Sequence, residues 1–135
     1  DIEAENAIAS KEMLEYIHLN KTGALIKAAV KAGLYLGNPT GSMIIDLEKY
    51  AENMGIAYQI ADDILDVNGN PEETGKATGS DKKKNKNTYT TILGVEAARL
   101  RLEELTEMAV KSIDKYYDNA EFFRNLVLNL AKRTK

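Results

Sequence analysis

The chain has 135 residues, of which 44% are hydrophobic and 29% are charged, and its formal net charge is −3. These values are typical of one globular domain, and the mild negative charge argues against a nucleic-acid partner. The chain has no cysteine and a single histidine, His18, which excludes disulfides and thiolate metal sites and disfavours a zinc hydrolase or a Ser-His triad. The lack of cysteine favours a cytoplasmic location, and no apolar run approaches the roughly 18 residues that a membrane span needs.

The composition predicts an all-α protein, because Ala, Leu, Glu and Lys are abundant and only two prolines occur. Residues 10–36 are predicted to form a helix that kinks near Lys21, where Gly23 interrupts the run. The apolar positions of this helix are Leu14, Ile17, Leu25, Ala28 and Ala32. A turn over residues 36–42 follows, with Thr40 or Ser42 as the cap of a second helix that runs to about residue 68.

The C-terminal part of the chain predicts two further helical regions. One covers about 88–115 and is expected to be split near Gly94. Its apolar stripe consists of Ala98, Leu102, Leu105, Ala109 and Ile113. The last helix is expected to begin at "DNAE", with Asp118 and Glu121 as a capping box, and to bury Phe122, Leu126 and Leu130. Residues 68–87 fit no element, and loops of this length inside a domain are usually functional or disordered.

The helix over residues 42–68 is apolar on two sides and acidic in one narrow sector. At 100° per residue, one apolar side consists of Leu47, Tyr50, Ala51, Met54, Tyr58, Ala61 and Leu65. The other apolar side consists of Ile56, Ile60, Ile64 and Val67. The sector between them holds Gly55, Gln59, Asp62, Asp63 and Asp66. A helix that is apolar on most sides is a buried helix. The acidic sector is therefore expected to face an internal cleft.

Three carboxylates in such a sector repel one another, and a bound cation would offset this repulsion. Two carboxylates about 4 Å apart repel by roughly 4 kcal/mol at an effective dielectric constant near 20, and Mg²⁺ bound by one or two carboxylates, waters and phosphate oxygens would remove that penalty. A solvated helix face is the alternative interpretation. A calcium-binding EF-hand loop is excluded, because counting from Asp66 places Pro71 at the position of its glycine and Ala77 at the position of its glutamate.

Basic residues lie on both sides of the acidic sector in the sequence. In "GKATGSDKKKNK", glycines allow a close backbone approach to a ligand, and Lys76 and Lys86 could meet phosphate oxygens. Lys21, beside Thr22 at the expected kink, suits an anion site. A solvated charged loop and an exposed helical lysine are the alternative interpretations. Together with the aspartates, these residues indicate a diphosphate held by a metal ion and ammonium groups.

Three segments carry a resemblance to a known family. "IHLNKTGALI", "GIAYQIADDILDV" and "GKATGSDKKKNKNTYTTILG" resemble, in order and spacing, the C-terminal half of the trans-isoprenyl diphosphate synthases, the family of farnesyl and geranylgeranyl diphosphate synthases. Thr90 stands where many bacterial members have proline. The resemblance spans essentially all 135 residues and implies an antiparallel helical bundle, in which residues 1–135 form one helical domain that is part of a larger synthase. The family's first aspartate-rich motif is absent from this sequence.

The resemblance implies a reaction and a set of residue roles. The complete enzyme would join an allylic diphosphate (dimethylallyl, geranyl or farnesyl diphosphate) to isopentenyl diphosphate, head to tail and with Mg²⁺ as cofactor. It implies metal binding by Asp62, Asp63 and Asp66, diphosphate binding by Lys21, Lys76 and Lys86, and catalytic roles for Lys21, Thr22 and Gln59. Because the sequence holds only one of the family's two aspartate-rich motifs, this chain alone is expected to be inactive.

Two other functions and one assembly are also compatible with the sequence. The chain could be a non-catalytic regulatory module that pairs with a complete synthase, or a relative of the terpene cyclases. "DDILD" followed by Gly-Lys favours the synthase over the cyclase. Because helices that would cover one face of residues 42–68 are expected to be missing, apolar surface should be exposed, and a homodimer is expected.

Overall fold

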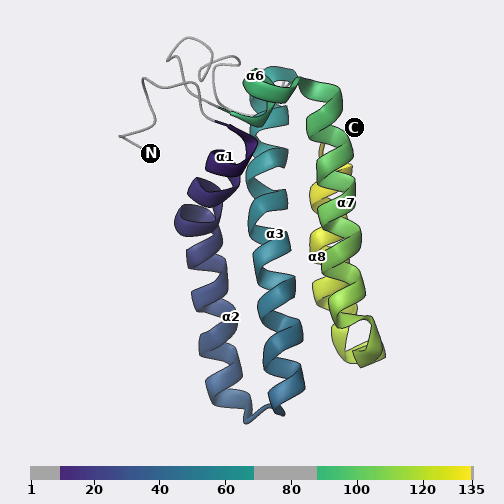
Figure 1. The fold of residues 1–135 in the computed structure, drawn as a ribbon. Coiled ribbons are helices and arrows are strands. Elements are labelled where there is room, and N and C mark those ends of the chain that lie inside the picture. Colours follow the sequence, from purple (N-terminus) through teal and green to yellow (C-terminus); the bar gives the residue numbers. More distant parts are fainter. Residues whose placement is uncertain (1–9, 69–87, 135) are drawn as a thin grey trace.

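The computed structural model describes residues 10–68 and 88–134, which are helical and contain no strand (Figure 1). The elements are α1 (Lys11–His18), the π-helical segment η2 (Leu19–Gly23), α2 (Ala24–Gly37), α3 (Gly41–Asn68), α6 (Tyr89–Leu93), α7 (Val95–Ile113), the 3₁₀ segment η3 (Asp114–Ala120) and α8 (Glu121–Lys132). The predicted all-α fold is confirmed. Among the described residues, no helix is long and apolar enough to cross a lipid bilayer.

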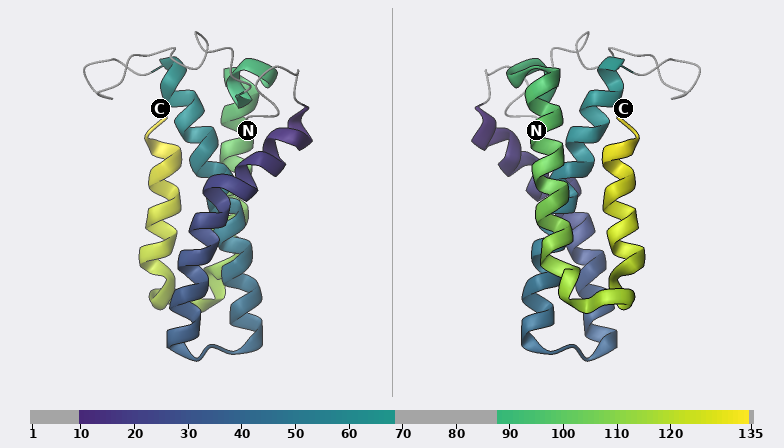
Figure 2. Two further views of the ribbon diagram at one scale, coloured as in Figure 1. Left: turned by 90° about the vertical axis from the view of Figure 1, so that its left-hand side faces the viewer. Right: turned by 90° about the vertical axis from the view of Figure 1, so that its right-hand side faces the viewer.

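The long helices form an antiparallel bundle around α3. Helices α2 and α3 run in opposite directions, as do α7 and α8 (Figures 1 and 2). Helix α3 packs on α7 most extensively and also contacts α1, α2, α6 and α8. Its buried apolar residues are Tyr50, Ala51, Ile56, Ala57, Ile60, Ala61 and Ile64. The prediction of a buried helix over residues 42–68 is therefore confirmed, although Tyr58 and Val67 are exposed.

The kink predicted near Lys21 is present as the π-helical segment η2 (Figure 2). It lies where the chain crosses α3, and the two backbones come so close that a Cβ atom built on Gly55 would lie 2.7 Å from the Cα atom of Gly23. Glycine on both helices permits this approach. Single π-helical turns inside α-helices are frequent at functional sites. The position of Lys21 and Thr22 in η2 therefore supports them as candidate site residues.

Two predicted boundaries are confirmed by their capping groups. The Thr40 hydroxyl accepts a hydrogen bond from the Met43 amide at 3.4 Å, just before α3. The split near Gly94 separates α6 from α7, and Gly94 has a φ of +85°, which glycine adopts without strain. All five residues of the predicted stripe on α7 are buried.

The prediction for the last helix is wrong in two respects. The segment η3 covers residues 114–120, so α8 begins at Glu121 and its N-cap, Ala120, makes no side-chain capping bond. The side chain of Asp118 lies outside the described residues. The buried residues of α8 are Val127 and Leu130, whereas Phe122 is 69% exposed and Leu126 is also largely outside the core. Leu130 is buried as predicted, but Val127 is buried in place of Phe122 and Leu126, so the inner face of α8 is rotated from the predicted one.

The apolar face predicted for α2 is also wrong. Ala28 and Ala32 are exposed, as are Leu25 (74%) and Leu36 (91%), while Leu34 is buried. The reason is that α2 packs chiefly on α3, along one side, so that the alanine-rich side remains uncovered. This surface is consistent with the expected homodimer, which stays a prediction that light scattering on the purified chain would test.

Candidate functional site

The π-helical segment brings the Lys21–Thr22 turn against the middle of α3. The Thr22 hydroxyl donates a hydrogen bond to Oε1 of Gln59 at 3.2 Å, across 37 positions of sequence. Thr22 and Gln59 are half-buried, and Lys21 is exposed. Two of the three segments that the sequence singled out therefore meet in the fold, and the lysine stands at the rim of their contact.

The three aspartates have different surroundings. Asp62 is exposed and Asp66 is half-buried, whereas only 4% of Asp63 is exposed. The expectation that all three line one water-poor chamber is therefore not met. Neighbouring residues on a helix point about 100° apart, and α6 packs on the side of α3 that carries Asp63.

Asp63 is held by donors from two elements. Its Oδ1 atom accepts from Nε2 of Gln59 at 3.2 Å, and its Oδ2 atom accepts from the backbone amide of Tyr89 at 3.0 Å. A buried carboxylate needs such donors to offset its lost hydration. Because Gln59 also accepts from Thr22, one hydrogen-bonded chain links η2, α3 and the first residue of α6.

A cavity adjoins this chain of hydrogen bonds. It measures about 350 Å³ and lies between the end of α3 and α6. Asp63 and Asp66 line it on one side, and Thr88, Thr90 and Thr91 line it on the other. Carboxylates and hydroxyl groups therefore face a common space beside the exposed Asp62.

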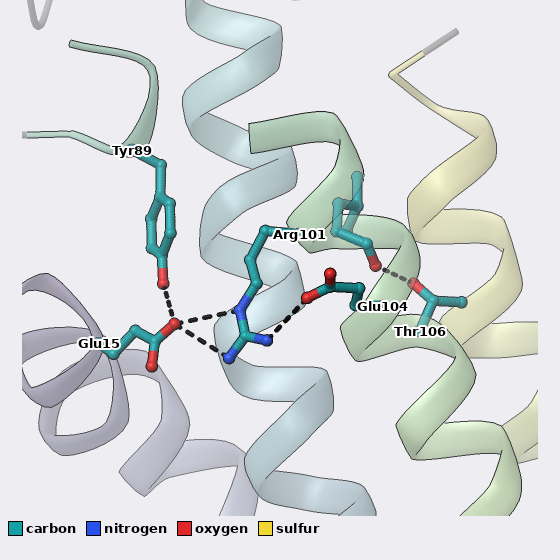
Figure 3. Close-up of polar contacts among 6 residues, drawn as sticks. Glu15, Tyr89, Arg101, Glu104 and Thr106 are labelled. Atoms are coloured by element: carbon teal, nitrogen blue, oxygen red, sulfur yellow. Dashed lines mark hydrogen bonds and ion pairs between the residues drawn. The ribbon is translucent and has the colours of Figure 1, made fainter. Parts of the chain in front are cut away.

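Tyr89 is the centre of a second polar cluster, which sequence reasoning missed (Figure 3). Its side chain is fully buried, and its hydroxyl group donates to Oε1 of Glu15 at 2.7 Å. Arg101 contacts the same Oε1 atom through Nε at 3.1 Å and Nη2 at 3.0 Å, and it pairs with Glu104 at 3.0 Å. Burial, and then the Glu15 carboxylate, raise the pKa of Tyr89. Partners that are 74 and 86 positions apart leave no local signal in the sequence.

His18 is buried beside this cluster, with its ring centroid 5.4 Å from that of Tyr89. No side-chain or backbone group of the described residues forms a hydrogen bond with its Nδ1 atom. Burial, and then the positive charge of Lys21, lower the pKa of His18 to about 4, while Glu15 acts in the opposite direction. The imidazole is thus neutral at pH 7.

The low pKa of His18 predicts a loss of stability in acid. An unfolded histidine binds a proton below its ordinary pKa of 6.5, whereas the buried ring does so only near 4. The contribution of the neutral His18 ring to the free energy of unfolding is therefore complete above pH 6.5 and is lost as the pH falls towards 4. At pH 5 the free energy of unfolding is lower by about 2 kcal/mol for this reason. We expect the free energy of unfolding to fall between pH 7.5 and pH 5 by about that much more in the unmodified chain than in His18→Phe. Urea unfolding at both pH values measures the difference, and equal losses in the two proteins would contradict it.

Lys76 and Lys86 lie outside the described residues. Within residues 10–68 and 88–134, no group of three or more His, Cys, Asp or Glu side chains is arranged to hold a metal ion. Mg²⁺, however, takes only one or two protein carboxylates and completes its shell with waters and phosphate oxygens. Asp62 and Asp66, which are one helical turn apart and not fully buried, fit that requirement.

Comparison with known proteins identifies the family to which the sequence is similar. The polyprenyl synthetase family model matches residues 1–123. The chain is 42% identical to the farnesyl diphosphate synthase of Escherichia coli over 114 residues, which are 84% of this chain and 38% of that protein. It is 37% identical to the farnesyl diphosphate synthase of Micrococcus luteus over 138 aligned positions, which cover 100% of this chain and 46% of that protein.

A solved structure agrees with these matches. The geranyltransferase of Helicobacter pylori, complexed with magnesium and isoprenyl diphosphate, superposes with a TM-score of 0.77 and 29% identity, over 99% of this chain and 44% of that one. The chain thus spans less than half the length of the relatives it matches. Because the family model covers nearly the whole sequence and the helices follow the same arrangement, the chain belongs to the polyprenyl synthetase family.

Proposed function

We propose that this chain supplies the C-terminal half of a trans-isoprenyl diphosphate synthase, which joins an allylic diphosphate to isopentenyl diphosphate head to tail. The observation that carries the proposal is the hydrogen bond between Thr22 and Gln59. It brings the turn that bears Lys21 to the face of α3 from which the aspartates project. A cationic group and carboxylates that are far apart in sequence are thereby brought to one helix, at whose end Asp63 and Asp66 line a cavity.

The exposed and half-buried aspartates suit the metal. Asp62 and Asp66 would hold Mg²⁺ from one side, and substrate phosphate oxygens and water would complete its shell. When bound, the ion supplies Lewis-acid stabilisation of the diphosphate leaving group. The other carboxylate clamp that the reaction needs would come from the part of the synthase that precedes this chain. Dimethylallyl, geranyl and farnesyl diphosphate are the candidate allylic substrates.

The chain's own residues would orient the substrate and protect the reacting carbon. Lys21 would contact diphosphate oxygens as a point charge, together with Lys76 and Lys86. The Thr22 oxygen and the Gln59 amide oxygen would face the positive charge that develops on the allylic carbon. Their mutual hydrogen bond, and that of Gln59 with Asp63, hold both dipoles in place before the substrate arrives.

The test uses the complete protein that contains this chain. Incubation with isopentenyl diphosphate, Mg²⁺ and each of the three allylic diphosphates in turn should yield prenyl diphosphates that are longer by five-carbon units, and mass spectrometry would identify them. If the folded complete protein forms no such product with any of them, the proposal is wrong. Stimulation of a separate synthase by an inactive protein would instead support the regulatory function.

A related prediction concerns the 135-residue chain by itself. With a single carboxylate cluster it should bind magnesium diphosphate weakly and form no prenyl product, because the leaving group would be neutralised from one side only. Radiolabelled isopentenyl diphosphate gives a sensitive assay, with the complete protein as the positive control. Prenyl product from the isolated chain would contradict this division of the site.

A further inference from the structure

The buried aspartate of the acidic motif is engaged differently from its neighbours. Asp63 is 4% exposed, and its carboxylate oxygens accept hydrogen bonds from Gln59, one turn earlier on α3, and from the Tyr89 amide of α6. Asp62 is exposed and Asp66 is half-buried. A metal ligand must direct an oxygen lone pair at the ion and reach it with low desolvation cost. One acceptor site on each oxygen of Asp63 is already used by a protein donor, the Gln59 side-chain amide on one oxygen and the Tyr89 backbone amide on the other.

The backbone amide that Asp63 binds lies at the start of a helix. Tyr89 is the first residue of α6, where amide groups have no partner within the helix. The cap residue Thr88 bonds the amide of Thr91, and Asp63 takes the amide of Tyr89. The carboxylate therefore closes the N-terminus of α6 against α3.

The tyrosine is also fixed at the far end of its side chain. Its hydroxyl group donates to Glu15, which Arg101 holds from α7 (Figure 3). Residue 89 is thus secured from α1, α3 and α7 at once, close to the point where residues 69–87 rejoin the described chain. Any movement of Asp63 towards a metal ion would break its bond to this anchored residue.

We propose that Asp63 is a positioning residue, which ties α6 to α3 through the Tyr89 amide and orients Gln59, and that it is not a metal ligand. The part of this inference that concerns the metal rests on the proposed function, and it leaves the metal to Asp62 and Asp66. The structural part is independent of any ligand. The tie also keeps Gln59 facing Thr22, since the amide group of Gln59 donates to Asp63 while its oxygen accepts from Thr22.

Two substitutions at position 63 separate the two roles. Asp63→Asn keeps the shape of the side chain, and its oxygen can still accept from Tyr89, while a turn of the Gln59 amide restores the second bond. Asp63→Ala removes both acceptors and leaves a buried amide group without a partner. Asp62→Asn and Asp66→Asn are the matched variants on the same helix, since they neutralise carboxylates that are not buried.

The experiment measures two quantities in the complete protein. The first is the melting temperature without metal, and the second is the affinity for inorganic diphosphate in the presence of Mg²⁺, by titration calorimetry. Asp63→Ala should lower the melting temperature by about 4 °C. Asp62→Asn should weaken the binding of magnesium diphosphate by at least about tenfold without a change in melting temperature, because Mg²⁺ takes few protein carboxylates. Asp63→Asn should retain the affinity within about threefold.

Each outcome bears on the proposal. If Asp63→Asn weakens binding as much as Asp62→Asn at an unchanged melting temperature, Asp63 is a metal ligand and the inference is wrong. It is also wrong if Asp63→Ala melts like the unmodified protein. If the unmodified protein does not bind magnesium diphosphate, the proposed function fails, while the metal-free melting temperatures still test the tie to Tyr89.

Discussion

Replacing Asp62 with alanine in the complete enzyme should lower the turnover number by roughly 10²–10⁴-fold. Asp62 is the exposed carboxylate of the acidic motif, so it is the one most open to a magnesium diphosphate. Its loss would remove a ligand from the ion that stabilises the leaving group, and this interaction strengthens as the allylic C–O bond breaks. The effect should therefore appear in kcat rather than in KM alone.

The matched control for this variant is Glu103→Ala. Glu103 is an exposed carboxylate on α7, so its removal changes the net charge by the same amount without touching the acidic motif. Steady-state kinetics at saturating Mg²⁺ compare the two variants, and circular dichroism confirms that both are folded. Near-normal turnover in the Asp62→Ala protein would remove Asp62 from the mechanism.

Replacing Gly55 with alanine should destabilise the fold by about 3 kcal/mol. A Cβ atom at this position would lie 2.7 Å from the Cα atom of Gly23, which belongs to the backbone of the π-helical segment and cannot turn aside as a side chain could. The helices would have to separate, and the packing on both sides of α3 would loosen with them. Because the same contact places Thr22 beside Gln59, the complete enzyme should also lose activity.

The control for the glycine prediction is Gly33→Ala on α2. A Cβ atom at Gly33 meets nothing within 4 Å, so alanine should stabilise the helix by about 0.5–1 kcal/mol through its better propensity. Urea unfolding of the two variants beside the unmodified chain gives both values. Equal stability of Gly55→Ala and Gly33→Ala would show that the close crossing of η2 and α3 does not form.

The helices themselves could be predicted because their signals are local. Glycine interrupts the first helix at Gly23 and separates two helices at Gly94, and both breaks are found there. The stripe on α7 repeats at helical spacing and is buried. The sequence predicts that α3 is buried, because apolar residues on two of its sides leave little surface for water. Each of these conclusions needs only neighbours within a few turns.

The faces of α2 and α8 could not be predicted in the same way. Alanine suits both a core and a surface, so the row that contains Ala28 and Ala32 does not identify the inner side of α2. In α8, aromatic and leucine side chains occur on several sides, so the sequence does not single out Val127 as a buried residue. Which side of each of these two helices is buried depends on how the helix packs against its neighbours.

The candidate site, too, could be predicted only in part from the sequence. The amino-acid sequence is enough to identify aspartates at one-turn spacing on an apolar helix and a lysine beside a helix break. The packing of α6 on α3 buries Asp63 beside Tyr89 and leaves Asp62 exposed, and it is the fold that brings Glu15 and Arg101 to that tyrosine. The physical reason is sequence separation. Helical periodicity gives information only about residues a few positions apart, whereas these hydrogen bonds join residues that are 26, 74 and 86 positions apart.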